Sequence, residues 1–197
     1  MATIRLASAD DAGAIAAIYR PAVEGTAISF ETEPPDEQEM RRRIVEILRG
    51  HPWLLLERSG EVVGYAYASP HRARAAYQWS VDMSAYVDER FRGQGVGHAL
   101  YLSLLAILSA QGFVNAYAGI TLPNPQSVAL HQRVGFTPIG VYRNVGYKLG
   151  AWRDVGWWER TIRSHDAPPP RVQALDALQQ TASWQPLLTT GLAVVRA

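Results

Sequence analysis

The chain has 197 residues, a formal net charge of +1 and no cysteine. This length suits one domain, and the near balance of charge gives no electrostatic case for binding nucleic acid or an anionic membrane. The lack of cysteine excludes disulfides, a thiolate metal site and a cysteine nucleophile. The N-terminal segment has no apolar signal-peptide core, and no run is long enough to cross a bilayer. We therefore expect a cytoplasmic protein without a metal.

Hydrophobic periodicity predicts alternating strands and helices. Ser8 and Asp11 have the spacing of a capping box in front of an apolar helical repeat, and Asp36 can cap a second helix that Gly50 ends. The predicted elements are a strand at 3–7, helices at 8–23 and 34–50, a strand hairpin at 53–68, a strand at 77–87, a helix at 95–111, a strand at 113–120, a helix at 124–135 and a closing hairpin at 138–162. This order indicates an α/β or α+β fold with helices on both faces of one mixed sheet.

A run of prolines after residue 166 marks a boundary. Residues 1–163 therefore form the predicted domain, and residues 164–197 form a C-terminal tail. The tail mixes prolines with a short amphipathic segment and an apolar segment. Two interpretations stay open at this point, a disordered tail and a tail that packs on a partner subunit.

Three glycines stand at alternate positions in front of the helix at 95–111. A helix start presents unpaired N–H groups and a partial positive charge, and glycine lets a ligand phosphate approach them. A tight strand-to-helix turn with no ligand explains the same glycines. The spacing of Gly93, Gly95 and Gly97 matches neither the P-loop nor the dinucleotide fingerprint.

The stretch from Arg92 to Gly97, R-x-x-G-x-G, resembles the pyrophosphate-binding motif of the GNAT acetyltransferases. The blocks "HPWLLLE", "GYAYASPHRARAAYQW", "LHQRVGF" and "GYKLGAWRDVGWWE" are similar, in matching order, to the phosphinothricin N-acetyltransferase family. The resemblance runs from about Ile4 to Arg163. It implies the GNAT acyl-CoA N-acyltransferase fold, with a mixed central sheet and helices on both faces.

The resemblance implies that acetyl-CoA is the cosubstrate. Backbone N–H groups of the glycine loop would bind its pyrophosphate, and the thioester would lie in a splay between the strands at 80–87 and 113–120. Asn124 fits the family motif N-x-x-S and fits a plain helix N-cap equally well. The implied cofactor-binding residues are Tyr86, Val87, Arg92, Gly93, Gln94, Gly95, Val96, Gly97, Asn124 and Ser127.

Attack on a thioester requires an amine that has lost its ammonium proton, and an α-amino group has a pKa of about 8. A carboxylate or an imidazole can accept that proton. Asp82 lies in a strand poor in other charges, where a carboxylate is costly without a role or a partner; an outward-facing aspartate is the alternative. The family has glutamate there, so the shorter aspartate favours a relay through water. His131 is the second candidate carrier, with a packing histidine as its alternative.

The resemblance places the acceptor site near "SPHRARAAYQW". Arg72 and Arg74 can bind a carboxylate or phosphinate, although solvated loop charge is the alternative for each. Phe30 and Tyr77 fit a pocket wall or the core. His71 stands where close relatives have tryptophan, so the acceptor need not be phosphinothricin itself.

We therefore expect an enzyme that acetylates the α-amino group of a small amino acid or analogue, such as phosphinothricin, methionine sulfoximine or methionine sulfone. The expected partners are a small-molecule amine and a second copy in a homodimer, with no nucleic acid and no membrane. Two alternatives stay open. One is a GNAT enzyme that acts on another small amine or a protein N-terminus, and the other is a non-catalytic acyl-CoA-binding module.

Overall fold

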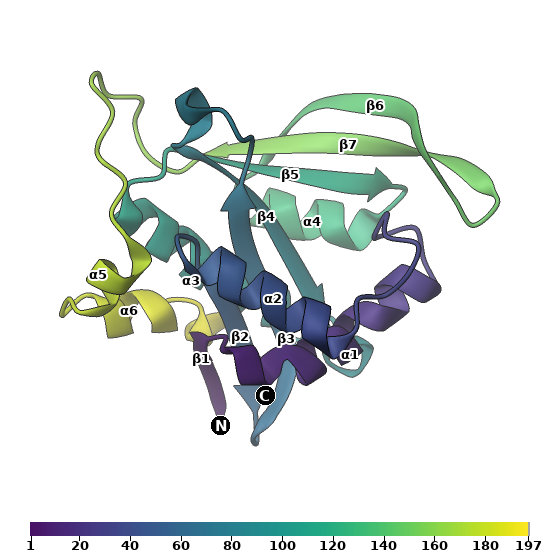
Figure 1. Cartoon of the computed structure of the whole chain (residues 1–197), viewed down its shortest axis with the longest axis horizontal. Helices are drawn as coiled ribbons and strands as arrows, with labels where there is room; N and C mark the ends of the chain where they lie inside the picture. Colours follow the sequence, from purple (N-terminus) through teal and green to yellow (C-terminus); the bar gives the residue numbers. More distant parts are fainter. Residues whose placement is uncertain (197) are drawn as a thin grey trace.

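The computed structural model describes residues 1–196. Its strands form one mixed sheet in the order β1-β2-β3-β4-β5-β7-β6 (Figure 1). All neighbouring pairs are antiparallel except β4 and β5. The strands are β1 (Ala2–Leu6), β2 (Trp53–Arg58), β3 (Glu61–Pro70), β4 (Ser80–Val87), β5 (Asn115–Leu122), β6 (Thr137–Lys148) and β7 (Ala151–Thr161).

Helices cover both faces of the sheet, as the sequence predicts. The capping box of Ser8 and Asp11 is present, and Asp36 accepts a hydrogen bond from the Glu39 N–H. The helices are α1 (Ala12–Glu24), α2 (Glu37–Leu48), α3 (Val96–Gln111), α4 (Pro125–Arg133), α5 (Leu175–Gln179) and α6 (Trp184–Thr189), with short 3-10 turns η1 (Ala9–Asp11), η2 (Ala75–Tyr77), η3 (Glu89–Phe91) and η4 (Leu192–Val194).

Helix α3 is apolar around its whole circumference, which is typical of a helix buried on all sides. One side packs on β2, β3 and β4, and α6 lies against the helix as well. Leu100, Leu104 and Leu108 have no exposed surface. On the opposite face of the sheet, α1 and α2 pack over a second apolar cluster that contains Ile15 and Ile44. The sheet is thus a layer between two groups of helices (Figure 1).

The C-terminal tail packs on α3 of its own chain, which neither of the two interpretations of the tail anticipated. Leu175, Leu178, Trp184 and Leu188 are at most 8% exposed and belong to the same core cluster as α3. The Gly191 N–H donates to the Ser103 hydroxyl on α3. The tail therefore supplies the outer cover that the apolar sequence of α3 requires.

The parallel pair β4–β5 is short. Its register covers only Ser80 to Asp82 against Asn115 to Tyr117, while β4 continues to Val87 along β3. Beyond Asp82 the edge of β4 that faces β5 therefore has backbone groups without a strand partner. The two strands form the predicted splay.

The main differences from the predicted elements lie next to this splay. Residues 77–79, predicted as strand, form the end of η2 and a loop, and β5 begins two residues later than predicted. Strand β7 lies between β5 and β6, so β6 is the edge strand. Within residues 1–196, no helix is long and apolar enough to span a membrane.

Candidate active site

A cleft of about 400 Å³ opens at the splay, between the end of β4, the start of α3 and helix α4. The Gly93, Gln94 and Gly95 N–H groups donate no backbone hydrogen bond to a described residue, and the first turn of α3 adds N–H groups that lack i−4 partners. Of the predicted cofactor-binding residues, those that line the cleft are Tyr86, Val87, Arg92, Gly93, Gly95, Val96, Gly97, Asn124 and Ser127.

Gln94 is the predicted cofactor-binding residue that does not line the cleft. Its amide nitrogen donates to the Arg90 carbonyl at 3.0 Å, and its amide oxygen accepts from Arg58. Its own carbonyl accepts from the Arg196 N–H at 3.0 Å. The Gln94 side chain therefore supports the glycine loop from behind, and the last residues of the tail help to hold it.

The shape of the glycine loop depends on conformations that favour glycine. Gly93 has φ of 76° and Gly95 has φ of 86°, in the left-handed region where a Cβ is costly. A Cβ on Gly95 would lie 2.3 Å from the Val194 carbonyl oxygen of the tail, whereas one on Gly93 would meet nothing within 4 Å. The sequence showed the glycines, but it gave no sign that the tail lies against them.

Helix α4 forms the opposite wall of the cleft. The Asn124 side chain accepts from the Ser127 N–H at 3.1 Å, so Asn124 caps α4. The helix N-cap and the predicted cofactor contact are therefore compatible at Asn124, because the same residue also lines the cleft.

His131 on α4 is only 4% exposed and lines the same cleft. Its Nδ1 lies 2.7 Å from the Ser127 carbonyl, and its Nε2 lies 3.0 Å from the Tyr101 hydroxyl. Because a carbonyl only accepts, Nδ1 carries the proton and Nε2 accepts from Tyr101. Burial lowers the pKa of His131, so the ring is neutral at neutral pH with both nitrogens engaged.

Asp82 is the last residue of β4 that pairs with β5, so it lies where the splay begins. Its Oδ1 lies 2.7 Å from Nδ1 of His71, at the end of β3. Burial raises the pKa of Asp82, while the bond to His71 opposes that rise. Asp82 therefore has a partner that the sequence did not reveal, although both residues were singled out separately.

An aromatic cluster surrounds this pair on the face of the sheet that carries α1 and α2. The His71 ring stacks on Tyr117 with centroids 4.3 Å apart, and the edges of Tyr77 and Trp157 approach it at 5.9 and 6.2 Å. The Arg72 guanidinium lies 5.7 Å from the centre of the Trp157 ring. The tryptophans of β7 were predicted to pack in the sheet or at a subunit interface, so Trp157 was not predicted as a site residue. Only the register of β5 and β7, which pairs Trp157 with Gly119 near Tyr117, brings it into this cluster.

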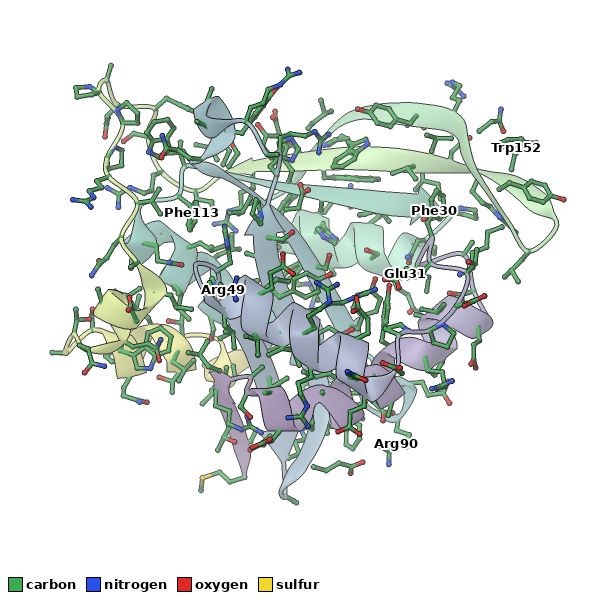
Figure 2. The ribbon with its side chains drawn as sticks, in the orientation of Figure 1. Phe30, Glu31, Arg49, Arg90, Phe113 and Trp152 are labelled. Atoms are coloured by element: carbon green, nitrogen blue, oxygen red, sulfur yellow. The ribbon has the colours of Figure 1, made fainter. Side chains whose placement is uncertain are left out.

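Two predicted acceptor residues stand apart from this cluster. Arg74 is exposed and forms no side-chain hydrogen bond or ion pair with the described residues. Phe30 is 40% exposed, and its ring lies against Gly146 of β6, below the β6–β7 hairpin (Figure 2).

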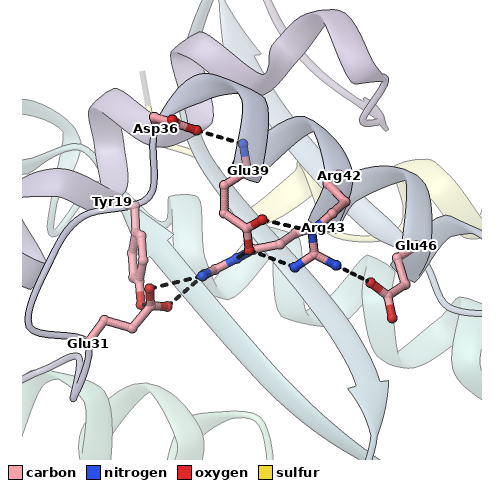
Figure 3. Close-up of polar contacts among 7 residues, drawn as sticks. All are labelled: Tyr19, Glu31, Asp36, Glu39, Arg42, Arg43 and Glu46. Atoms are coloured by element: carbon pink, nitrogen blue, oxygen red, sulfur yellow. Dashed lines mark hydrogen bonds and ion pairs between the residues drawn. The ribbon is translucent and has the colours of Figure 1, made fainter.

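The loop that carries Phe30 is fixed by polar contacts. Glu31 accepts hydrogen bonds from Tyr19 on α1 and from the two terminal nitrogens, Nη1 and Nη2, of Arg43 on α2 (Figure 3). Burial raises the pKa of Glu31, but these bonds outweigh it and leave the pKa lowered. Lys148 of β6 donates to the Val23 and Ser29 carbonyls from the other side. The position of Phe30 is therefore set by α1, α2 and β6 together.

A second cavity of about 580 Å³ lies between α1, α2 and strands β2 and β3. Stacked rings of Trp53, Tyr65 and Tyr67 line it, and it reaches Ser69 and Pro70 at the end of β3. Ser69 pairs with Asp82, so this cavity adjoins the His71–Asp82 pair. None of its lining residues was predicted from the sequence to belong to a site.

Among residues 1–196, no three histidine or carboxylate side chains gather in a way that could hold a metal ion.

Known proteins resemble this chain in sequence and in structure. A family described as "Acetyltransferase (GNAT) domain" matches residues 4–157. A phosphinothricin N-acetyltransferase of Streptomyces viridochromogenes is 41% identical over 85% of this chain and 91% of that protein. An L-methionine sulfoximine/L-methionine sulfone acetyltransferase of Salmonella typhimurium is 32% identical over 84% of this chain and 98% of its own length.

A crystal structure of a phosphinothricin acetyltransferase from Sinorhizobium meliloti, in complex with AcCoA, superposes with a TM-score of 0.82 at 37% identity. It covers 86% of this chain and 92% of that one. The chain therefore belongs to the GNAT acetyltransferase family. It is an N-acetyltransferase, and the predicted fold class is confirmed.

Proposed function

We propose that the protein transfers the acetyl group of acetyl-CoA directly to the α-amino group of a small amino acid analogue of the phosphinothricin, methionine sulfoximine or methionine sulfone type. The observation that carries the proposal is a cleft lined by the glycine loop and by Tyr86 and Val87 of β4, the strand on which the Asp82 carboxylate lies where pairing with β5 stops. The names of the similar proteins support the class of acceptor.

The cleft suits a pyrophosphate. Free N–H groups of the glycine loop and the first turn of α3 point to an anion site, and Arg92 adds charge beside them. Tyr86 and Val87 lie along the unpaired edge of β4, where backbone groups can bind an extended pantetheine chain as an added strand would. A backbone N–H at this edge would also stabilise the oxyanion that forms on attack.

In the proposed reaction, the acceptor amine loses its ammonium proton at the Asp82 site and attacks the thioester carbonyl. The C–N bond forms, the tetrahedral intermediate collapses, and the C–S bond breaks. The thiolate leaves and takes up a proton. The reaction needs no covalent enzyme intermediate. Arg72 lies beside the pair and can bind the carboxylate or phosphinate of the acceptor.

We infer that His131 supports the cofactor cleft rather than carrying the amine's proton. Both of its ring nitrogens are engaged inside the protein, and burial keeps it neutral. Asp82, in contrast, is 29% exposed.

We also propose a homodimer formed through the β6–β7 hairpin. This hairpin extends beyond the rest of the sheet (Figure 1), and β6 is its edge. Trp152 stands on its outer surface (Figure 2). Exposed large apolar side chains gather on it, which marks an interaction surface: Ile139, Val141, Tyr142, Val145, Tyr147, Leu149 and Trp152. Light scattering should show a dimer that Trp152→Ser weakens. Val45→Ser, which removes an exposed apolar side chain from α2, should leave the dimer intact. A monomeric wild type would exclude this proposal.

The proposed activity is tested by thiol release from acetyl-CoA with a panel of amines. The panel contains phosphinothricin, methionine sulfoximine, methionine sulfone, the common amino acids and short peptides. Turnover on an amino acid analogue, lost in Asp82→Asn but kept in Asp10→Asn, would support the proposal. Asp10 is a matched control because its carboxylate is 94% exposed and remote from the cleft. Tight acetyl-CoA binding without turnover on any amine would refute it.

A further inference from the structure

We propose that His71 is the group that accepts the proton of the acceptor amine, and that Asp82 positions and stabilises its imidazole. This inference deepens the proposed function and rests on it. It identifies a further catalytic residue for the reaction and changes the role of Asp82.

The resemblance described above implies glutamate at 82 and tryptophan at 71, and the aspartate and histidine that stand there contact each other. In the structure, Nδ1 of His71 lies 2.7 Å from Oδ1 of Asp82. Ser69 pairs directly with Asp82 across β3 and β4, which brings the end of β3 beside the carboxylate. The Asp82 carboxylate and the His71 imidazole, which can carry a proton, are therefore in direct contact.

The pair has the geometry of a base held by a carboxylate. Because Asp82 accepts, Nδ1 of His71 is the protonated nitrogen, and Nε2 retains its lone pair. Nε2 has no hydrogen-bond partner among residues 1–196, and it is not one of the buried polar atoms. The free nitrogen is thus accessible to a ligand, while the other is fixed. An imidazole oriented in this way by a carboxylate is the arrangement of catalytic triads.

The ring is held on several sides, so its direction is defined. Tyr117 stacks on one face at 4.3 Å, and Tyr77 and Trp157 approach with their edges. The His71 side chain is 13% exposed, against 29% for Asp82. The charged or titratable groups around it on this face are Asp82 of β4, Tyr117 of β5, Glu159 of β7, and Arg72 and Tyr77 of the loop after β3.

The proposed step balances in protons. The ammonium of the acceptor gives one proton to Nε2, and His71 becomes an imidazolium paired with Asp82. The neutral amine attacks the thioester carbonyl, and its nitrogen becomes cationic as the C–N bond forms. The C–S bond breaks as this nitrogen gives its second proton to the departing thiolate, and His71 releases the first proton to solvent.

Ring-nitrogen NMR tests the pairing without any turnover. The five histidines are followed by proton–nitrogen NMR, and the His71 signals are the ones missing in His71→Asn. The wild type should show the tautomer with the proton on Nδ1 of His71, and Asp82→Asn should shift the His71 Nδ1 signal because the charged acceptor is gone. Unchanged His71 ring signals in Asp82→Asn would overturn the inference.

Two substitutions then separate a proton carrier from a residue that only positions Asp82. His71→Asn keeps an N–H donor near the place of Nδ1 but cannot accept a proton, and His71→Gln places its amide near Nε2. Both should lower kcat/KM by about 10²- to 10⁴-fold and leave the Kd for acetyl-CoA and the Tm near the wild-type values. The ascending limb of the pH profile that belongs to the base should disappear, and added imidazole should restore part of the rate in His71→Ala.

If His71→Asn keeps most of the activity and the same pH profile, Asp82 is the base and the inference fails. Each kinetic run includes the wild type on the full amine panel. A wild type that acetylates no amine refutes the proposed function, and the ring-nitrogen NMR then still decides whether His71 and Asp82 are paired.

Discussion

Gly95→Ala tests whether the tail holds the glycine loop in place. Gly95 has φ of 86°, and an added Cβ would lie 2.3 Å from the Val194 carbonyl oxygen. Gly93→Ala is the matched control, because Gly93 has φ of 76° but open space around the added Cβ. The left-handed conformation should cost each variant about 1–2 kcal/mol. For a chain of this size, this corresponds to a fall in Tm of about 2–4 °C per kcal/mol.

Gly95→Ala should lose more stability than Gly93→Ala, because the added Cβ forces the tail to move away from the glycine loop. The contacts at risk are the hydrogen bond from the Arg196 N–H to the Gln94 carbonyl and the bond from Arg58 to the Arg196 carbonyl. At about 0.5–1.5 kcal/mol for each bond, the additional loss is about 1–3 kcal/mol. The total for Gly95→Ala is therefore about 2–5 kcal/mol, against about 1–2 kcal/mol for Gly93→Ala.

Thermal and urea unfolding of both variants measure this difference. Both substitutions are then repeated in a chain that lacks residues 193–197, where the additional loss of Gly95→Ala should vanish. Equal losses in the two full-length variants would refute the reasoning. So would an additional loss that persists in the shortened chain.

Three further predictions concern the core, the acid side of the stability curve and the cleft. Trp184→Ala should cost about 3–5 kcal/mol by thermal unfolding because Trp184 is 8% exposed against α3, and the exposed Gln185→Ala should change little; equal effects would mean that the tail does not cover α3. The hydrogen bond from Arg5 lowers the pKa of Asp11 to about 2, so this ion pair stabilises the fold above pH 3.8 and the stabilisation is lost as the pH falls toward 2. Asp11→Asn should therefore flatten the dependence of unfolding free energy on pH between these values. An unchanged dependence would contradict the ion pair. His131→Ala should lower stability by about 1–3 kcal/mol, because it leaves a buried hydroxyl unpaired, while kcat falls less than tenfold; a 10²-fold loss in a folded variant would make it a proton carrier instead.

The element order and the glycine loop could be predicted from the sequence because both depend on residues close together along the chain. The capping box at Ser8 and the cap at Asp36 act within one helical turn. The ends of β4 and β5 were less predictable, because they depend on where pairing stops. The alternating aromatic residues at 77–79 predicted a strand, but they form the end of η2 and a turn, and β4 begins only at Ser80.

The site was predicted as separate residues and not as contacts. His71 and Asp82 are 11 positions apart, and nothing in their local pattern shows that antiparallel pairing of β3 and β4 brings them together. Trp157 was predicted to pack on a half-buried strand, and it does lie on β7. Its place beside His71 depends on the register of β5 and β7. The tail was undetermined because its apolar residues match a surface of α3 that only the folded sheet creates.

The position of Arg196 has a practical consequence for purification and labelling. Arg196 is bonded directly behind the loop that we propose binds the pyrophosphate, so an affinity tag or fluorescent fusion that follows the tail would start beside the cofactor cleft. The amino end is not remote either, because Ala2 of β1 pairs with Arg58, whose guanidinium contacts Gln94 and Arg196. Comparing acetyl-CoA binding of forms tagged at either end with that of the untagged protein would reveal how strongly these contacts act on the loop.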